Sequence, residues 1–172
     1  MNLRPIGFII LLPLSSNPML SGQEFPENTL KADNCLPGKS YPRIYDDGRV
    51  IFQLNAPDAS EVIADIVGKK FPMVKDERSV WTLTTEPIGE GFHYYAFIVD
   101  GARVSDPATH TYFGANAALS GIDIPSPDMD FYLPRDVPHG EVRAKYYFSD
   151  IRNATRRCFV YTPPDYDQNT NE

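Results

Sequence analysis

The sequence has few of the residues on which catalysis and metal binding usually depend. Its 172 residues include two cysteines, three histidines and one tryptophan. Cys35 and Cys158 do not form a C-x-x-C pair, which argues against a structural zinc site. No serine lies in a Gly-x-Ser-x-Gly segment, where an α/β-hydrolase carries its nucleophile. We therefore expect no catalytic residue, metal ligand or cofactor site in this chain.

Basic residues and long apolar runs are also scarce. Lys and Arg number 16 against 23 Asp and Glu, so neither nucleic acid nor an anionic membrane is an expected partner. The nine residues 6–14 form an apolar run, whereas a helix that spans a membrane needs about 20. Arg4 precedes this run and small polar residues follow it, the order found in a secretory signal peptide. Residues 1–22 are thus a predicted signal peptide, and the protein is expected to be secreted or periplasmic.

What the sequence has in abundance favours an all-β fold. It contains 16 Pro, 11 Gly, 10 Tyr and 10 Phe, and no long segment has helical periodicity. The segment 79–107 predicts three strands, at residues 80–84, 92–99 and 103–105, with a tight hairpin turn at Asp100-Gly101. Further strands are predicted at residues 42–45, 50–55, 61–67, 71–74, 130–134, 142–148 and 155–161, and a long surface loop at residues 108–127.

The strand at residues 92–99 has two apolar faces. Alternation puts His93, Tyr95, Phe97 and Val99 on a core-facing side and Phe92, Tyr94, Ala96 and Ile98 on the other. In a strand with one solvent-exposed face, polar residues would alternate with apolar ones. The second face is therefore either buried as well or a contact surface, with Phe92, Tyr94 and Ile98 as the interdomain face.

The residues around this strand resemble a family-48 carbohydrate-binding module, an early-set immunoglobulin-like domain. The likeness is carried in order by Asp76, Val80, Trp81, Pro87, Ile88, Gly91, Tyr95, Phe97, Val99, Asp100, Gly101, Asp106 and Pro107. The resemblance implies a β-sandwich at residues 41–134, N-terminal to a starch-active or esterase domain, with Trp81 in its core. Residues 23–40 are then an N-terminal arm.

The end of the chain resembles the entry to a family 1 carbohydrate esterase domain of the feruloyl or acetyl-xylan type. The matching residues are Tyr146, Tyr147, Arg156, Arg157, Val160, Tyr161, Thr162, Pro163, Pro164 and Tyr166. The resemblance implies a linker at residues 135–141 and the first strands of a truncated esterase domain at residues 142–172. The expected fold is an immunoglobulin-like sandwich with an extra C-terminal β-hairpin.

These resemblances imply a non-catalytic module of a secreted bacterial carbohydrate esterase. It would bind or position a plant polysaccharide, xylan-like or starch-like, beside an esterase catalytic domain in the same chain. The alternative is a fragment of a serine esterase whose catalytic part is missing, with a purely structural sandwich. Two states of the cysteines also remain open: a Cys35–Cys158 disulfide, or free thiols.

The resemblance also suggests where a sugar would bind. Starch-binding members of the family use two tryptophans and a lysine, but Ala96 and Arg103 stand at two of these positions, and no tryptophan lies near residues 68–71. The candidate platform is therefore Tyr94 with Arg103, or Tyr112 and Phe113 in the predicted loop.

Overall fold

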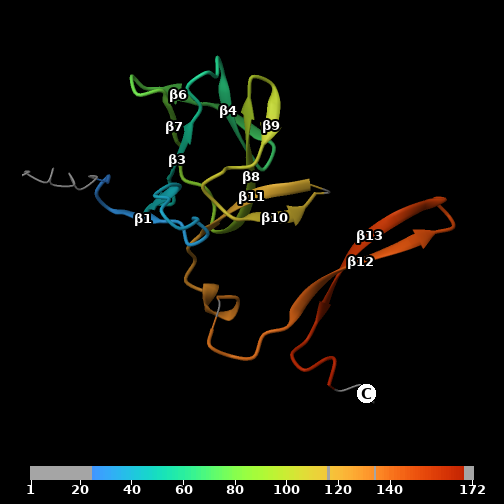
Figure 1. Cartoon of the computed structure of the whole chain (residues 1–172). Helices are drawn as coiled ribbons and strands as arrows, with labels where there is room; N and C mark the ends of the chain where they lie inside the picture. The colour runs from blue at the N-terminus through green and yellow to red at the C-terminus, as the bar shows by residue number, and fades with distance from the viewer. Residues whose placement is uncertain (1–24, 116, 134, 169–172) are drawn as a thin grey trace, which may run out of the picture. The chain divides into compact units, whose positions relative to one another are not determined.

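The computed structural model describes residues 25–115, 117–133 and 135–168. They belong to two compact units, Met1–Ser126 and Pro127–Glu172, which are described separately. The predicted signal peptide lies outside the described residues. Every regular element in the described ranges is a strand except one 3₁₀ turn, which confirms the all-β class (Figure 1). No helix among these residues is long and apolar enough to cross a membrane.

The first unit contains two antiparallel sheets. The five-stranded sheet has the order β1 (Thr29–Lys31), β2 (Arg43–Tyr45), β3 (Val50–Asn55), β7 (Val80–Thr84), β6 (Val74–Lys75). The six-stranded sheet has the order β10 (Thr111–Gly114), β11 (Ala117–Ile124), β8 (Gly91–Val99), β4 (Val62–Ile66), β5 (Lys69–Pro72), and β9 (Ala102–Val104) also pairs with β8.

The two sheets pack face to face around aromatic rings. Phe52 of β3 lies 4.8 Å from Tyr95 and 6.4 Å from Phe97 of β8, measured between ring centroids. All three side chains are fully buried. Trp81 is buried as well, and its Nε1 donates a hydrogen bond to the carbonyl of Ala56 at 2.9 Å. The unit is therefore a β-sandwich, and the predicted core position of Trp81 is confirmed. We call the described part of this unit the sandwich.

The hairpin predicted at Asp100-Gly101 is present. Both residues have positive φ, 47° and 87°, as a two-residue turn between β8 and β9 requires. The Asp100 carboxylate also accepts hydrogen bonds at 2.9 Å from the backbone N–H groups of Ser60 and Glu61. The same turn residue thus fixes the entry to β4, which explains why an aspartate suits this position.

Three expectations about the chain differ from the structure. Residues 108–127 are not a loop, because they contain β10 and β11, and β11 pairs with β8 over five residues. The expected strand at residues 130–134 is wrong, since a 3₁₀ turn, Met129–Phe131, lies there in the second unit. Within the predicted arm, β1 pairs with β2, and the N–H of Leu36 donates to the carbonyl of Ala108 at 2.8 Å. The arm is therefore part of the sandwich.

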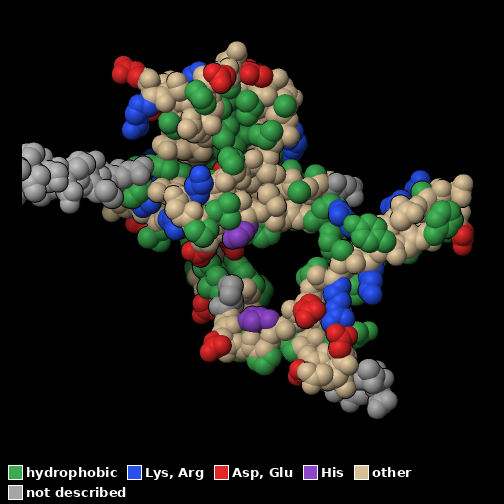
Figure 2. Space-filling model, viewed as in Figure 1, with side chains coloured by type: hydrophobic (Ala, Val, Ile, Leu, Met, Phe, Trp, Pro, Cys, Tyr) green, Lys and Arg blue, Asp and Glu red, His purple; other side chains and the backbone are tan. Residues whose placement is uncertain are grey.

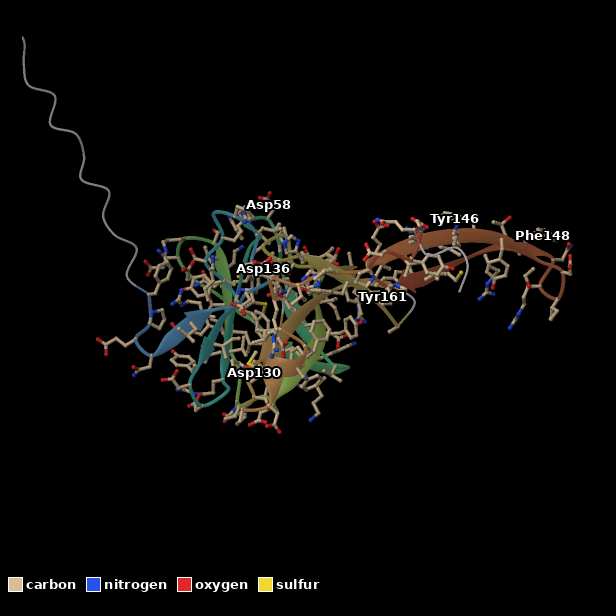
Figure 3. The ribbon with its side chains drawn as sticks, turned by 90° about the horizontal axis from the view of Figure 1, so that it is seen from below. Asp58, Asp130, Asp136, Tyr146, Phe148 and Tyr161 are labelled. Atoms are coloured by element: carbon tan, nitrogen blue, oxygen red, sulfur yellow. The ribbon has the colours of Figure 1, made fainter. Side chains whose placement is uncertain are left out.

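The second unit is built on the predicted C-terminal hairpin. Strands β12 (Glu141–Ser149) and β13 (Ala154–Thr162) pair over nine residues. Alternation places Val142, Tyr146, Phe148, Phe159 and Tyr161 on one face, and all of them are exposed. Tyr146, Phe148 and Tyr161 are labelled on this hairpin in Figure 3. Hydrophobic and basic side chains both appear on the surface of this ribbon (Figure 2). The hairpin itself is confirmed, and its apolar face is uncovered within the described part of its unit.

Candidate functional site

Three aromatic rings meet on the outer face of the six-stranded sheet. Phe92 lies 5.0 Å from Tyr94 and 5.1 Å from Tyr112, with the rings nearly perpendicular in both pairs. Phe92 and Tyr94 come from β8 and Tyr112 from β10, the two strands on either side of β11 (Figure 1). We call Phe92, Tyr94 and Tyr112 the aromatic cluster.

Two glycines make room for this cluster. A Cβ atom on Gly121 would lie 2.2 Å from Cζ of Phe92, and one on Gly114 would lie 2.3 Å from Cζ of Tyr94. The two rings therefore lie directly against the backbone of β11 and β10. Any side chain at these positions would push the rings off the sheet, so the glycines belong to the site rather than to a loop.

The cluster remains open to solvent. Phe92 is 44% exposed and Tyr112 36% exposed, although both rest on the sheet. Exposed aromatic rings of this size are typical of contact surfaces rather than of a buried core. This face was expected to be either buried or a contact surface, and its exposure in the sandwich favours the contact surface. The interdomain role of Phe92, Tyr94 and Ile98 stays a prediction.

An ion pair adjoins the cluster on the same face. Arg103 of β9 is paired with Ile98, and Asp65 of β4 is paired with Ala96. The Arg103 Nη1 atom lies 3.1 Å from Oδ2 of Asp65, so the guanidinium reaches diagonally across β8. The small side chain of Ala96 leaves this path clear. The Arg103 guanidinium thus lies near Ala96, two residues along β8 from Tyr94 on the same face. Ala96 and Arg103 are the positions where the resemblance implies a lysine and a tryptophan, respectively.

The structure brings together only some of the predicted site residues. Tyr94, Arg103 and Tyr112 share the outer face, but Phe113 is adjacent to Tyr112 in β10 and so lies on the opposite face. Phe113 is therefore not part of the same platform. Phe92 takes its place in the cluster; the alternation along residues 92–99 had already indicated its face.

Asn34 also contributes to the site, and sequence reasoning missed it. Its side-chain amide donates to the carbonyl of Gly121 at 2.5 Å. Burial raises the pKa of the Tyr112 hydroxyl, the nearby Asp123 raises it further, and a hydrogen bond with Asn34 opposes both effects. Asn34 lies in the segment taken for an arm, so nothing in the local sequence indicated that it would reach β11.

Asp106, in the Asp-Pro pair of the family pattern, is structural. Its buried carboxylate accepts hydrogen bonds from the Tyr95 hydroxyl at 2.8 Å and from the N–H of Ala108 at 2.7 Å. Its own N–H donates to Oγ of Ser120 at 2.8 Å. Burial raises the pKa of this carboxyl, while the bonds from Ala108 and Tyr95, and the charge of Lys39, oppose the rise. Asp106 thus ties β8, β11 and the following loop together.

This buried carboxyl makes stability depend on pH. Because folding raises the pKa of Asp106 above its ordinary value of 3.8, the folded protein holds the proton more tightly than the unfolded chain. The contribution to the free energy of unfolding is greatest at low pH and falls as the pH rises through the raised pKa. For Asp106→Asn, we expect the free energy of unfolding in urea to lack this decrease between about pH 3 and pH 7. Parallel pH curves for the variant and the parent would contradict this assignment.

The two cysteines lie in different units, and both are free thiols in the structure. Cys35 is half-buried and its Sγ donates to the carbonyl of Tyr41 at 3.2 Å. Burial raises the pKa of its thiol to about 11. Cys158 is exposed on β13. The disulfide between them stays a prediction.

Comparison with known proteins gives a sequence relative that matches most of this chain. The chain is 41% identical over 135 residues, 76% of its length, to a Xylanibacter ruminicola protein named endo-1,4-beta-xylanase/feruloyl esterase. It spans about a fifth, 19%, of that relative's length. No protein-family model matches the chain, so the family-48 resemblance stays a prediction.

Two solved structures show distant likenesses to the chain. The enterobactin esterase of Shigella flexneri has a TM-score of 0.48 at 16% identity, over 64% of this chain and 39% of its own. A putative alpha amylase from Salmonella typhimurium has a TM-score of 0.45 at 25% identity, over 61% and 18%. Both scores lie below 0.5.

Proposed function

We propose that the sandwich is a non-catalytic module that binds xylan for a secreted carbohydrate esterase. The observation that carries the proposal is the aromatic cluster beside the Arg103–Asp65 ion pair on one open face. Aromatic rings offer apolar surface to the C–H faces of sugar rings, and charged side chains beside them hydrogen-bond to the hydroxyls. The close relative named for xylanase and feruloyl esterase activity supports xylan as the polysaccharide.

The proposal assigns a role to each side chain. Phe92 and Tyr112, the two most exposed rings, would stack against successive xylose units. Tyr94 would support Phe92 from the side and offer its hydroxyl. Arg103, which is half-exposed although paired with buried Asp65, would direct its remaining N–H groups to sugar hydroxyls. The ion pair holds the guanidinium in place before a ligand arrives.

Export completes the proposal. Xylan lies outside the cell, and the apolar run at residues 6–14 after Arg4 gives the N-terminus the order of a secretory signal. Catalysis would belong to an esterase domain in the full-length protein. The hairpin β12–β13, with its exposed apolar face, is the segment we assign to the start of that domain.

Native gel electrophoresis in the presence of soluble xylan tests the proposal. We expect xylan to retard the 172-residue protein, and Tyr112→Ala to weaken its affinity about five- to tenfold, the loss expected for one stacked ring. Tyr147→Ala is the control, because Tyr147 is an exposed tyrosine on β12 of the other unit and should leave the retardation unchanged.

The alternative is a purely structural sandwich in a serine esterase. The exposed rings would then be covered by another part of the full-length protein. No retardation by either xylan or starch, with the protein folded, would favour this alternative. Retardation by starch but not by xylan would keep a binding role and overturn the choice of polysaccharide.

A further inference from the structure

A groove on the sandwich lies away from the aromatic cluster. It has a volume of about 480 Å³ and lies between the β4–β5 hairpin and the segment that leads into β8. Its lining residues are Ile66, Val67, Lys69, Phe71, Thr85, Glu86, Pro87, Ile88, Gly89 and His93. His93 alternates with Phe92 and Tyr94 along β8, so the groove opens from the inner side of the sheet. A volume of this size suits a small molecule or a substituent rather than a protein partner.

The groove has apolar walls and a polar rim. Ile66 is buried, and Phe71 and Ile88 are partly buried and pack against the hydrophobic core. Lys69 and Glu86 are exposed at the edge. Small-molecule sites commonly combine such walls with a few polar groups that fix the orientation of the ligand.

Strain in the backbone points to the same place. Val67 has a φ of 50°, in the left-handed region that a β-branched residue rarely adopts. It precedes Gly68, with φ of 82°, in a two-residue turn between β4 and β5, where asparagine or aspartate is usual. The Val67 side chain is nevertheless 66% exposed and lines the groove. The Val67 N–H donates to the carbonyl of Tyr94 at 3.1 Å, but the exposed side chain adds little burial to offset the strain, which favours a contact with a ligand.

The polar groups of the groove restrict the ligand further. His93 Nε2 lies 2.5 Å from the carbonyl of Gly89, and because a carbonyl only accepts, Nε2 is the donor. In the neutral ring Nδ1 is then an acceptor. Lys69 adds a cation at the rim. The groove therefore suits a flat apolar group with a hydroxyl to donate and a carbonyl or carboxylate to accept, whereas a sugar, polar around its whole edge, fits these walls poorly.

We propose that this groove binds a hydroxycinnamoyl group, with its ring against Phe71 and Ile88 and its carbonyl oxygen toward Lys69. The inference rests on the proposed function, because a feruloylated xylan would present such groups along the chain held by the aromatic cluster. The sandwich would then recognise the decoration of the polysaccharide as well as its backbone. The free acid and its ester both carry this ring and carbonyl, so the experiment compares the binding of the two.

Titration of the isotope-labelled 172-residue protein with ferulic acid and with methyl ferulate, followed by NMR, tests the proposal. Both ligands should shift the backbone signals of residues 66–71 and 85–89, with Kd of about 1 mM or tighter, as expected for a ligand of this size. Lys69→Gln should weaken the acid about tenfold and the ester less than threefold, because only the free acid is an anion. No loss of affinity for either ligand would place the carbonyl elsewhere and overturn the assigned orientation.

Two variants separate binding from folding. Phe71→Ala should abolish the shifts, and Phe71→Leu, which keeps the contact with the core, should weaken binding about fivefold while the protein stays folded. Val67→Asn should raise the melting temperature, because asparagine tolerates positive φ, and should weaken binding about threefold. A more stable Val67→Asn variant with unchanged binding would mean that the valine does not contact the ligand.

The two proposals fail in different ways. Undecorated xylo-oligosaccharide should bind the Phe71→Leu variant normally and lose affinity for Tyr112→Ala. No shifts with either ferulate ligand up to about 10 mM, with xylan retardation intact, would overturn the groove proposal alone. Ferulate shifts at the aromatic cluster instead of residues 66–71 would also overturn it. Ferulate binding in the groove without any xylan binding would leave the groove assigned and refute the proposed function.

Discussion

Replacement of Phe52 with alanine is expected to lower the free energy of unfolding of the sandwich by about 4 kcal/mol. Phe52 is fully buried on β3 and contacts Tyr95 and Phe97 of the facing sheet. The substitution leaves a cavity at the point where the two sheets meet, and rigid strands on both sides cannot close it. A loss of this size is a large fraction of the stability of an ordinary domain.

The same substitution at Phe92 is the matched control. Phe92 lies on the outer face of β8, 44% exposed, so Phe92→Ala should cost about 1 kcal/mol or less. Urea unfolding followed by the fluorescence of Trp81, the one tryptophan, reports on the sandwich in both variants. Similar losses for the two variants would mean that Phe92, on the outer face of the six-stranded sheet, is as buried as Phe52 between the two sheets, contrary to the assignment of core and open face.

The rates of amide hydrogen exchange should differ strongly between the two units. The amides of β12 and β13 should exchange at least about a thousandfold faster than those of β3 and β8. The hairpin has nine paired residues but exposes its apolar face, and an isolated two-stranded hairpin is marginal in water. Strands β3 and β8 lie at the centre of the packed sheets, where exchange requires global unfolding.

A variant that ends at Ser126 provides the control for this experiment. The exchange of β3 and β8 should not change, because the two units are separately compact. If the amides of β12 and β13 were protected as well as those of β3, the hairpin would have a partner within the chain. That result would contradict its assignment to the start of a further domain.

The sequence predicted the β8–β9 hairpin and the buried face of β8 well, because local chemistry determines both. Asp100-Gly101 supplies two positive φ angles, and few residues other than Asp, Asn and Gly do so easily. Strict alternation along residues 92–99 put Tyr95 and Phe97 together, and both are buried where expected. Trp81 followed from the resemblance, and its burial agrees.

The prediction failed where glycine served packing instead of chain reversal. The loop predicted at residues 108–127 contains Gly114 and Gly121, which in the structure lie in strands beneath Tyr94 and Phe92. This role depends on residues of another strand, so no local pattern reveals it. Once residues 111–114 are known to form a strand, alternation alone separates Phe113 from Tyr112.

The polar part of the site was beyond sequence reasoning for a similar reason. Asp65 and Arg103 meet only because β4 and β9 lie on opposite sides of β8, near small Ala96. Asn34 reaches β11 only because the N-terminal segment folds onto the sandwich. Strand order is the missing information in both cases.

NMR titration of the 172-residue protein with xylohexaose tests the central claim most directly. The account predicts saturable shifts at Phe92, Tyr94, Arg103 and Tyr112 on the outer face of the six-stranded sheet, and their loss in Tyr112→Ala. Shifts confined to the five-stranded sheet, or none at concentrations where the xylan gel shows retardation, would contradict it.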